Sequence, residues 1–127
     1  MLENKNILVT GAGSGIGRAT SLLAASYGAN VFCVDLTDGA ETTAARIMES
    51  GGSAQGHRAN VAEETEVEAY IEACVASYGS IDGIYANAGV SGGGKSVTEL
   101  TVEDWQRTLG VNTICLLYTS PSPRDCQ

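Results

Sequence analysis

The chain has 127 residues, which is enough for one domain and too few for two of ordinary size. Seven basic and fifteen acidic residues give a net charge of −8, which argues against nucleic acid or an anionic membrane surface as a partner. The sequence contains no run of roughly 18 apolar residues, no signal peptide, no Cys-x-x-Cys pair and only one histidine. We therefore expect a folded cytoplasmic protein without a metal site.

Apolar runs and helical patterns alternate along the chain and predict alternating strands and helices. The predicted strands are Asn6–Thr10, Asn30–Asp35, residues 53–59 and residues 81–86. The predicted helices run from residue 16 to near 28, over 40–50 and 63–78, and onward from a Thr-x-x-Asp cap at Thr101. Because parallel strands need a crossover connection and the helices supply it, this order predicts parallel βαβ units and an α/β fold.

Apolar side chains recur at helical spacing in two of the predicted helices. In the first helix they are accompanied by one serine, and the set is Ile16, Ala19, Leu22, Leu23 and Ser26. In the helix over 63–78 the spacing predicts one shared face for Val67, Tyr70, Ile71, Cys74, Val75 and Tyr78.

The segment TGAGSGIG at residues 10–17 lies between the first strand and the first helix. Glycines permit positive φ and leave room for a ligand at the backbone, and the unpaired N–H groups that begin a helix suit a pyrophosphate. The spacing departs from the ordinary G-x-G-x-x-G motif because Ile16 occupies the last glycine position. The alternative is a flexible glycine loop without a ligand.

Asp35 ends the second predicted strand, eighteen residues after Gly17. A dinucleotide-binding fold presents an acid at this place to the adenosine ribose, and a carboxylate there accepts two hydroxyl hydrogen bonds. It would also repel a 2′-phosphate by roughly 1 kcal/mol or more. A solvent-exposed aspartate at the end of a strand is the alternative, which the preceding glycine turn disfavours.

Five motifs, in this order, resemble those of the short-chain dehydrogenases/reductases. They are the glycine turn, Asp35, Asn60-Val61, Asn87-Ala88-Gly89 and Val111-Asn112. The resemblance covers residues 4 to about 112 and implies a Rossmann-like doubly wound parallel sheet, with strand order 3-2-1-4 in the part present. It also implies an NAD-dependent oxidoreductase that acts on a small-molecule secondary alcohol or ketone, and a parent enzyme that is a homo-oligomer.

The resemblance also implies the roles of individual residues toward the NAD cofactor. The pyrophosphate would be held by Gly11, Ser14, Ile16 and Gly17, the ribose by Asp35 and Leu36, and the adenine by Asn60 and Val61. The cofactor under the fourth strand would be lined by Asn87, Ala88 and Gly89. Asn60 stands where an aspartate is commoner, and its amide oxygen can still accept from the adenine amino group.

Asn112 is the one candidate catalytic-site residue. Its spacing from Trp105 and Leu109 predicts that it lies on a helix stripe facing the sheet, where its amide needs hydrogen-bond partners. In the family that it resembles, the matching asparagine positions a water of the proton relay. The alternative is a core or helix-end asparagine whose amide is satisfied by the protein.

The catalytic serine and Tyr-x-x-x-Lys of the family are missing from this sequence. No tyrosine is followed by a lysine four residues later, so the chain lacks the acid/base that the hydride step needs. We expect an inactive N-terminal part of an enzyme, with residues 1–114 belonging to its NAD-binding domain. The alternative is a non-catalytic NAD-binding module.

A second alternative is a P-loop, because residues 89–96 match G-x-x-x-x-G-K-S. Lys95 would then reach the β- and γ-phosphates of a nucleotide, and Ser96 would hold magnesium at the start of a helix. Two features disfavour this alternative. The pattern overlaps Asn87-Ala88-Gly89, and no apolar strand ending in a metal-binding acid follows it.

The tail at residues 115–127 differs in composition from the rest of the chain and contains both prolines, Pro121 and Pro123. Eleven residues from Cys115 to Asp125 resemble the in-frame translation of a transposon-type sequencing adapter. The alternative is an ordinary proline/serine terminus. We interpret the tail as non-native and exclude it from the fold.

We expect the source DNA from about codon 115 to read as adapter sequence. Resequencing the locus from an independent library tests this. Codons that differ throughout from the adapter, or a second read that continues through the same thirteen residues, would show that the tail is native.

Overall fold

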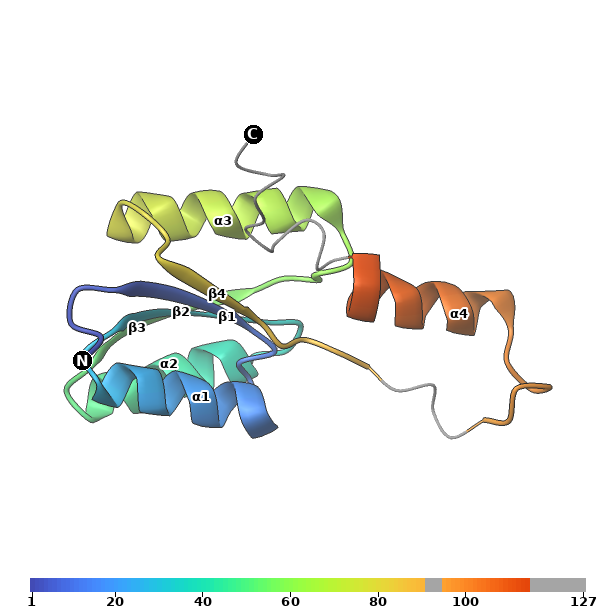
Figure 1. The fold of residues 1–127 in the computed structure, drawn as a ribbon, viewed down its shortest axis with the longest axis horizontal. Helices are drawn as coiled ribbons and strands as arrows, with labels where there is room; N and C mark the ends of the chain where they lie inside the picture. Colours follow the sequence, from blue (N-terminus) through green and yellow to red (C-terminus); the bar gives the residue numbers. More distant parts are fainter. Residues whose placement is uncertain (91–94, 115–127) are drawn as a thin grey trace.

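The computed structural model describes residues 1–90 and 95–114, and its centre is a four-stranded parallel sheet (Figure 1). The strands are β1 (Asn6–Thr10), β2 (Asn30–Asp35), β3 (Ser53–Arg58) and β4 (Gly83–Ala86). The helices are α1 (Gly15–Ser26), α2 (Gly39–Glu49), α3 (Glu64–Tyr78) and α4 (Val102–Leu109), followed by a π-helical turn, η1 (Gly110–Ile114). The strand order is β3-β2-β1-β4, so the predicted α/β fold and strand order are confirmed.

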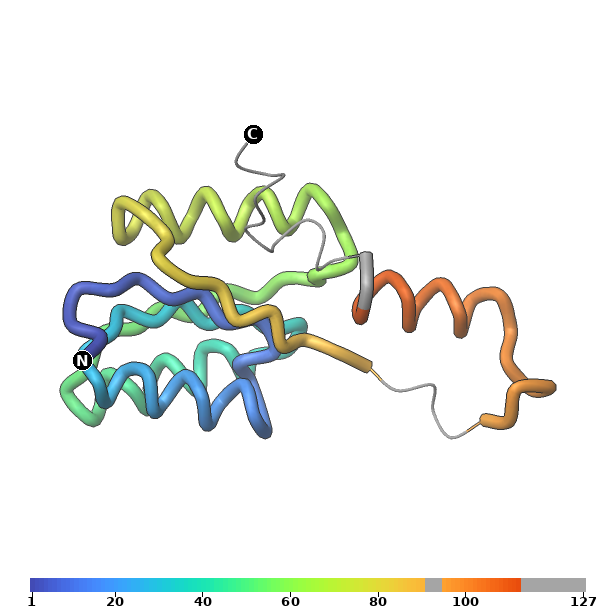
Figure 2. The backbone as a smooth tube through the Cα atoms, viewed as in Figure 1, coloured from blue at the N-terminus to red at the C-terminus, as the bar shows by residue number. Residues whose placement is uncertain are grey.

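Helices cover both faces of the sheet, with α1 and α2 on one side and α3 on the other (Figure 1, and the backbone trace in Figure 2). Successive side chains of a strand point to opposite faces, so every second residue of a central strand meets each layer. Leu8 and Phe32 pack toward α3, whereas Val9, Val31 and Cys33 pack with residues of α2. A strand that is buried on both faces needs a continuous apolar run, which is why the first two strands could be recognised in the sequence.

The contact face of α1 is made by small residues. Its buried residues are Gly17 and Ser21, and the Ser21 hydroxyl donates to the Gly17 carbonyl at 2.8 Å. Ile16 and Leu23, from the apolar spacing noted in the sequence, are 69% and 57% exposed. The fully buried part of this contact is therefore made without bulky side chains, while Leu22 packs partly against the same core.

The predicted face of α3 is confirmed except at one position. Val67, Tyr70 and Cys74 are buried, and Ile71 and Tyr78 pack partly against the same core. Val75 is 41% exposed, so its assignment to the face was wrong. Tyr70 and Cys74 supply the buried contacts of that helical turn, and Val75 lies at the edge of the stripe.

The fourth strand is two residues shorter than predicted. Asp82 lies just before β4, and its carboxylate accepts the Asn6 backbone N–H at 2.8 Å. A side-chain oxygen thus takes the place of a backbone carbonyl at the beginning of β1. Regular pairing starts one residue later, with Ile7 beside Gly83.

Helix α4 projects beyond the sheet instead of packing on it (Figures 1 and 2). The predicted cap is confirmed, because the Thr101 side chain accepts from the Asp104 N–H and the Asp104 carboxylate accepts from the Thr101 N–H. The predicted sheet-facing stripe is wrong, since Trp105 is 51% and Leu109 is 45% exposed and α4 buries no residue. Asn112 also lies in the π-helical turn η1, outside the α-helical register that the spacing assumed.

Among the glycines of the described residues, Gly17 leaves the least room for a Cβ, so a methyl group there should lower the stability of the fold strongly. A Cβ added at Gly17 would lie 2.0 Å from the Gly11 carbonyl oxygen, so Gly17→Ala requires α1 to move away from the turn. We expect a loss of about 3 kcal/mol or more in the free energy of unfolding, measured by urea denaturation and circular dichroism.

Gly110→Ala is the matched control. Gly110 has φ −59° and ψ −46°, and an added Cβ would meet only the Ala62 Cβ at 3.7 Å. This substitution should be neutral or slightly stabilising. Equal stability of the two variants would contradict the close-packing account.

Candidate nucleotide-binding site

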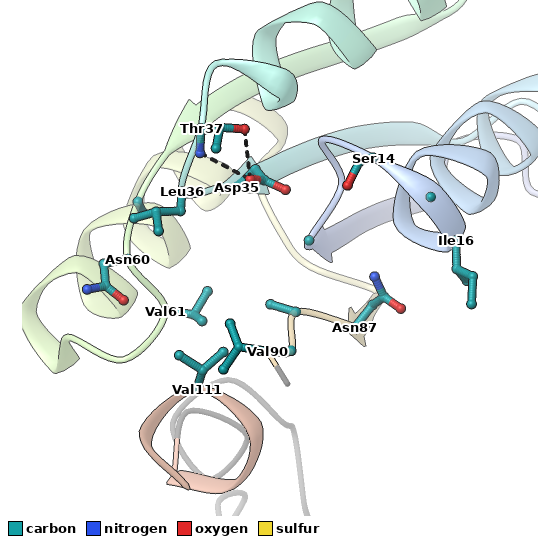
Figure 3. A pocket seen from close by; sticks show the side chains of 15 residues that line it. Ser14, Ile16, Asp35, Leu36, Thr37, Asn60, Val61, Asn87, Val90 and Val111 are labelled. Atoms are coloured by element: carbon teal, nitrogen blue, oxygen red, sulfur yellow. Dashed lines mark hydrogen bonds between the residues drawn. The ribbon is translucent and has the colours of Figure 1, made fainter. Parts of the chain in front are cut away.

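A cavity of about 450 Å³ lies beside the carboxyl ends of β1, β2 and β4 (Figure 3). It is lined by Gly11, Ser14, Gly15, Ile16, Asp35, Leu36, Thr37, Ala59, Asn60, Val61, Asn87, Ala88, Gly89, Val90 and Val111. Every residue that the sequence assigned to cofactor binding is in this set except Gly17, which lies beneath the turn. The volume falls within the usual range of small-molecule sites.

The glycine turn brings backbone N–H groups to the cavity wall. Gly11 and Gly15 have φ of 69° and 52°, and an added Cβ at Gly15 would meet nothing within 4 Å. Ser14 is the N-cap of α1, and no side-chain hydrogen bond caps this helix. The first N–H groups of α1 and the positive end of its dipole are therefore available to an anion, which fits the phosphates of a nucleotide.

Thr10 joins the ends of β1 and β4 below the turn. Its hydroxyl oxygen accepts the backbone N–H groups of Asn87 and Ala88, at 3.1 and 3.2 Å. The chain that follows β4 is thus fixed against the glycine turn. This contact explains why Asn87 and Ala88 reach the same cavity as Gly11.

Asp35 lies between the glycine turn and the chain that leads into α2 (Figure 3). One of its oxygens accepts the Gly13 N–H at 2.8 Å. The other accepts both the backbone N–H and the hydroxyl of Thr37, each at 3.1 Å. The carboxylate is therefore held at the cavity wall, where a ribose hydroxyl can reach it.

Apolar walls flank the far side of the cavity. Val61 is 7% exposed, and Leu36, at 65%, extends from the end of β2. The Asn60 amide oxygen accepts the Ala62 N–H at 3.0 Å, which leaves it one further lone pair. A flat ring between Leu36 and Val61 would find apolar contact and one polar acceptor, which fits an adenine.

Asn112 contacts the loop after β4 instead of lining the cavity. Its amide donates to the Val90 carbonyl and accepts the Val90 N–H, both at 2.7 Å. These two bonds attach η1 to the segment that contributes Gly89 and Val90 to the cavity wall. The amide is satisfied by the protein, so its position supports an indirect role through this segment.

Several cavity residues were missed in the sequence. Gly15, Thr37, Ala59, Val90 and Val111 line the cavity without having been assigned to it. Thr37 had a usable signal, because an aspartate side chain often accepts the backbone N–H two residues later in an Asx turn, and Thr37 follows Asp35 at that distance. Gly15 and Val111 belong to motifs noted in the sequence but were given no role there. Ala59 and Val90 directly neighbour assigned residues.

The described residues of the motif contradict the P-loop interpretation. A P-loop requires a helix at the Lys-Ser pair, but residues 97–99 form a turn and α4 begins only at Val102. The Lys95 ammonium pairs with the Asp104 carboxylate at 2.9 Å. The remaining residues of the motif, 91–94, and the tail from residue 115 lie outside the described residues.

Other reactive groups in the described ranges belong to the core. Burial raises the pKa of both Cys33 and Cys74 to about 11, so these thiols are protonated at neutral pH. Among residues 1–90 and 95–114, no group of three or more potential ligands could hold a metal ion, and no helix could span a membrane.

The fold and site together define a class of protein. A parallel sheet, a glycine turn before a helix N-terminus and an acid at the end of β2 are the features of a Rossmann-type nucleotide-binding domain. A family model described as short chain dehydrogenase matches residues 5–122. The chain belongs to this family of oxidoreductases, whose members bind a nicotinamide cofactor.

Curated relatives match over most of this chain. Cyclohexanol dehydrogenase of Acinetobacter sp. (strain SE19) is 38% identical, over 92% of this chain and 47% of that protein. D-threitol dehydrogenase of Mycolicibacterium smegmatis is 39% identical, over 87% and 43%. The chain spans about half the length of these curated relatives.

Solved structures with a similar fold also match this chain. A short-chain dehydrogenase/reductase variant of Serratia marcescens has a TM-score of 0.88 at 30% identity, covering 94% of this chain and 49% of that one. A metagenomic short-chain oxidoreductase, solved in complex with NADP, has a TM-score of 0.87 at 24% identity, covering 92% and 53%. The second likeness concerns the fold alone.

The capping contacts of Asp104 predict a low titration midpoint. The Thr101 backbone N–H, and next the Lys95 ammonium, lower the pKa of this carboxyl from 3.8 to about 2. Because the folded-state pKa is lowered, the stabilisation of α4 is present above pH 4 and is lost as the pH falls through 2. We expect NMR titration of the Asp104 carboxyl carbon to give a midpoint near 2.

Lys95→Ala separates the two causes of this low pKa. The midpoint should rise only part of the way toward 3.8, because the Thr101 N–H remains in place. A midpoint near 3.8 in the unsubstituted chain would contradict the capping geometry.

Proposed function

We propose that this chain is the adenosine-binding part of an NAD-dependent oxidoreductase that acts on a secondary alcohol or ketone. The observation that carries the proposal is the Asp35 carboxylate, which is held at the wall of a nucleotide-sized cavity beside the N-terminus of α1. The α1 N–H groups would bind the pyrophosphate, Asp35 and Leu36 the ribose, and Asn60 and Val61 the adenine.

The substrate class is supported by the names of the relatives. Dehydrogenases of cyclohexanol and of D-threitol, both named for alcohols, are 38% and 39% identical to this chain. A bound nicotinamide would accept or supply the hydride. Asn87, Ala88 and Gly89 would line its path under β4, and Asn112 would hold that segment through Val90.

The proton-transfer groups would come from a part of the protein beyond this chain. We propose that residues 1–114 are the N-terminal part of the NAD-binding domain and that the tail at 115–127 is not native, although the family match extends to residue 122. A serine and a Tyr-x-x-x-Lys downstream in the source gene would support the enzyme. A gene without them would favour a non-catalytic NAD-binding module.

The charges around Asp35 support NAD rather than NADP. Ser14 and Leu36 provide no cation for a 2′-phosphate. Arg58 pairs with Asp35 in the register of β2 and β3, but its guanidinium is bonded to the Glu41 carboxylate at 3.2 Å. None of these positions therefore offers an unpaired cation, and the Asp35 carboxylate would repel a 2′-phosphate.

The remaining parts of the proposal concern the protein's surroundings. The net charge of −8 supports a small-molecule substrate and opposes nucleic acid or an anionic membrane as a partner. The exposed Trp105 and Leu109 of α4 are compatible with a homo-oligomeric parent enzyme. The four widely spaced cysteines, without a Cys-x-x-Cys pair, support a cytoplasmic location.

Isothermal titration of the chain with NADH and NADPH tests the cofactor assignment. We expect tighter binding of NADH, and we expect Asp35→Ala to weaken NADH binding by about 1–3 kcal/mol while reducing the preference over NADPH. Asp38→Ala is the matched control, because Asp38 is exposed, does not line the cavity and makes no side-chain capping bond at the start of α2. Tighter binding of NADPH by the unsubstituted chain would contradict the proposal.

A further inference from the structure

The Asp35 carboxylate is engaged by three donors of the protein. Gly13 donates to Oδ2 at 2.8 Å, and the backbone N–H and hydroxyl of Thr37 donate to Oδ1 at 3.1 Å each. A carboxylate has about four lone-pair positions, so one remains for a ligand. One ribose hydroxyl can therefore bind this carboxylate while all three protein donors stay in place.

Thr37 is the donor that lies beside a bound ligand, because it is exposed and lines the cavity. Gly13, by contrast, is buried, and a Cβ added there would lie 2.8 Å from the Asp35 Cγ. The Thr37 hydroxyl also accepts the Gly39 N–H at 3.1 Å. A chain of hydrogen bonds thus runs from the start of α2 through Thr37 to Asp35, and Figure 3 shows its part between Thr37 and Asp35.

We propose that Thr37 is the positioning residue for ribose recognition. Its two hydrogen bonds to Oδ1 fix the orientation of the Asp35 carboxylate, so that the remaining lone-pair position, on Oδ2, is presented to a ribose hydroxyl. This inference rests on the proposed function, since it assumes that a nucleotide ribose binds at Asp35. It assigns Thr37 a role toward the ligand that is separate from the start of α2.

A purely structural role makes a different prediction. If Thr37 only supported the start of α2, its loss would weaken every nucleotide that binds the cavity. If it acts through Asp35 on the ribose, its loss should weaken only nucleotides that carry ribose hydroxyls. ADP and 2′,3′-dideoxy-ADP differ only in these hydroxyls, so together they separate the two roles.

The experiment is isothermal titration of the 127-residue chain and its variants with ADP and with 2′,3′-dideoxy-ADP. Thr37→Val removes the hydroxyl and keeps the side-chain shape. We expect it to weaken ADP binding about three- to tenfold, the range of one ordinary hydrogen bond, and to leave dideoxy-ADP within about twofold. Thr37→Ser restores the hydroxyl and should restore ADP binding.

Thr42→Val is the matched control for loss of a threonine hydroxyl. The Thr42 hydroxyl donates to the Asp38 carbonyl at 3.3 Å, is exposed and lies away from the cavity lining. This variant should bind both nucleotides as the unsubstituted chain does. Far-ultraviolet circular dichroism of each variant verifies that α2 and the sheet are folded.

The outcomes separate this inference from the proposed function. ADP binding that Thr37→Val leaves unchanged, or equal weakening of ADP and dideoxy-ADP, overturns the role of Thr37 while the nucleotide site stands. Failure of the unsubstituted, folded chain to bind ADP overturns the proposed function and this inference with it. Selective loss of ADP binding that Thr37→Ser reverses supports both.

Discussion

The contact between α1 and the end of β1 is the constraint on which the rest of the site depends. Gly17 lies against the Gly11 carbonyl so closely that a Cβ would be 2.0 Å from its oxygen. Only a glycine at this place lets the helix begin directly above the strand, where its first N–H groups face the cavity. A larger residue in place of Gly17 would separate α1 from the sheet and move the positive end of the helix dipole away from the site.

Asp35 extends this arrangement from the turn to α2. Its carboxylate accepts the Gly13 N–H, and Gly39 at the start of α2 packs on Gly13 so closely that a Cβ there would lie 2.6 Å from the Gly13 carbonyl oxygen. The buried Thr43 hydroxyl adds a bond to the Ala12 carbonyl at 2.7 Å. The Asp35 carboxylate, which we propose binds the ribose, thus also helps to hold the glycine turn in place. The proposed ligand binding and the local stability therefore depend on the same residues.

The part of the site that follows β4 is held by fewer contacts. Thr10 fixes Asn87 and Ala88, and Asn112 fixes Val90 through two short hydrogen bonds. Beyond these contacts, α4 leaves Trp105 and Leu109 half exposed. Its cap at Thr101 and Asp104 is local, so α4 can form without packing its apolar stripe on the sheet.

The sequence by itself determined the local features of this protein. Continuous apolar runs specified the first two strands, and the Thr-x-x-Asp pattern specified the start of α4. The glycine turn and Asp35 indicated the candidate nucleotide site. Each of these signals is carried by residues that are near one another in the chain. Tertiary structure decided the rest. Asn112 satisfies its amide on Val90, the Asp35 carboxylate is shared with Gly13 and Thr37, and α4 does not face the sheet. Spacing along a helix gives the direction of a side chain but not its partner, since the partner is fixed only when separate elements pack together.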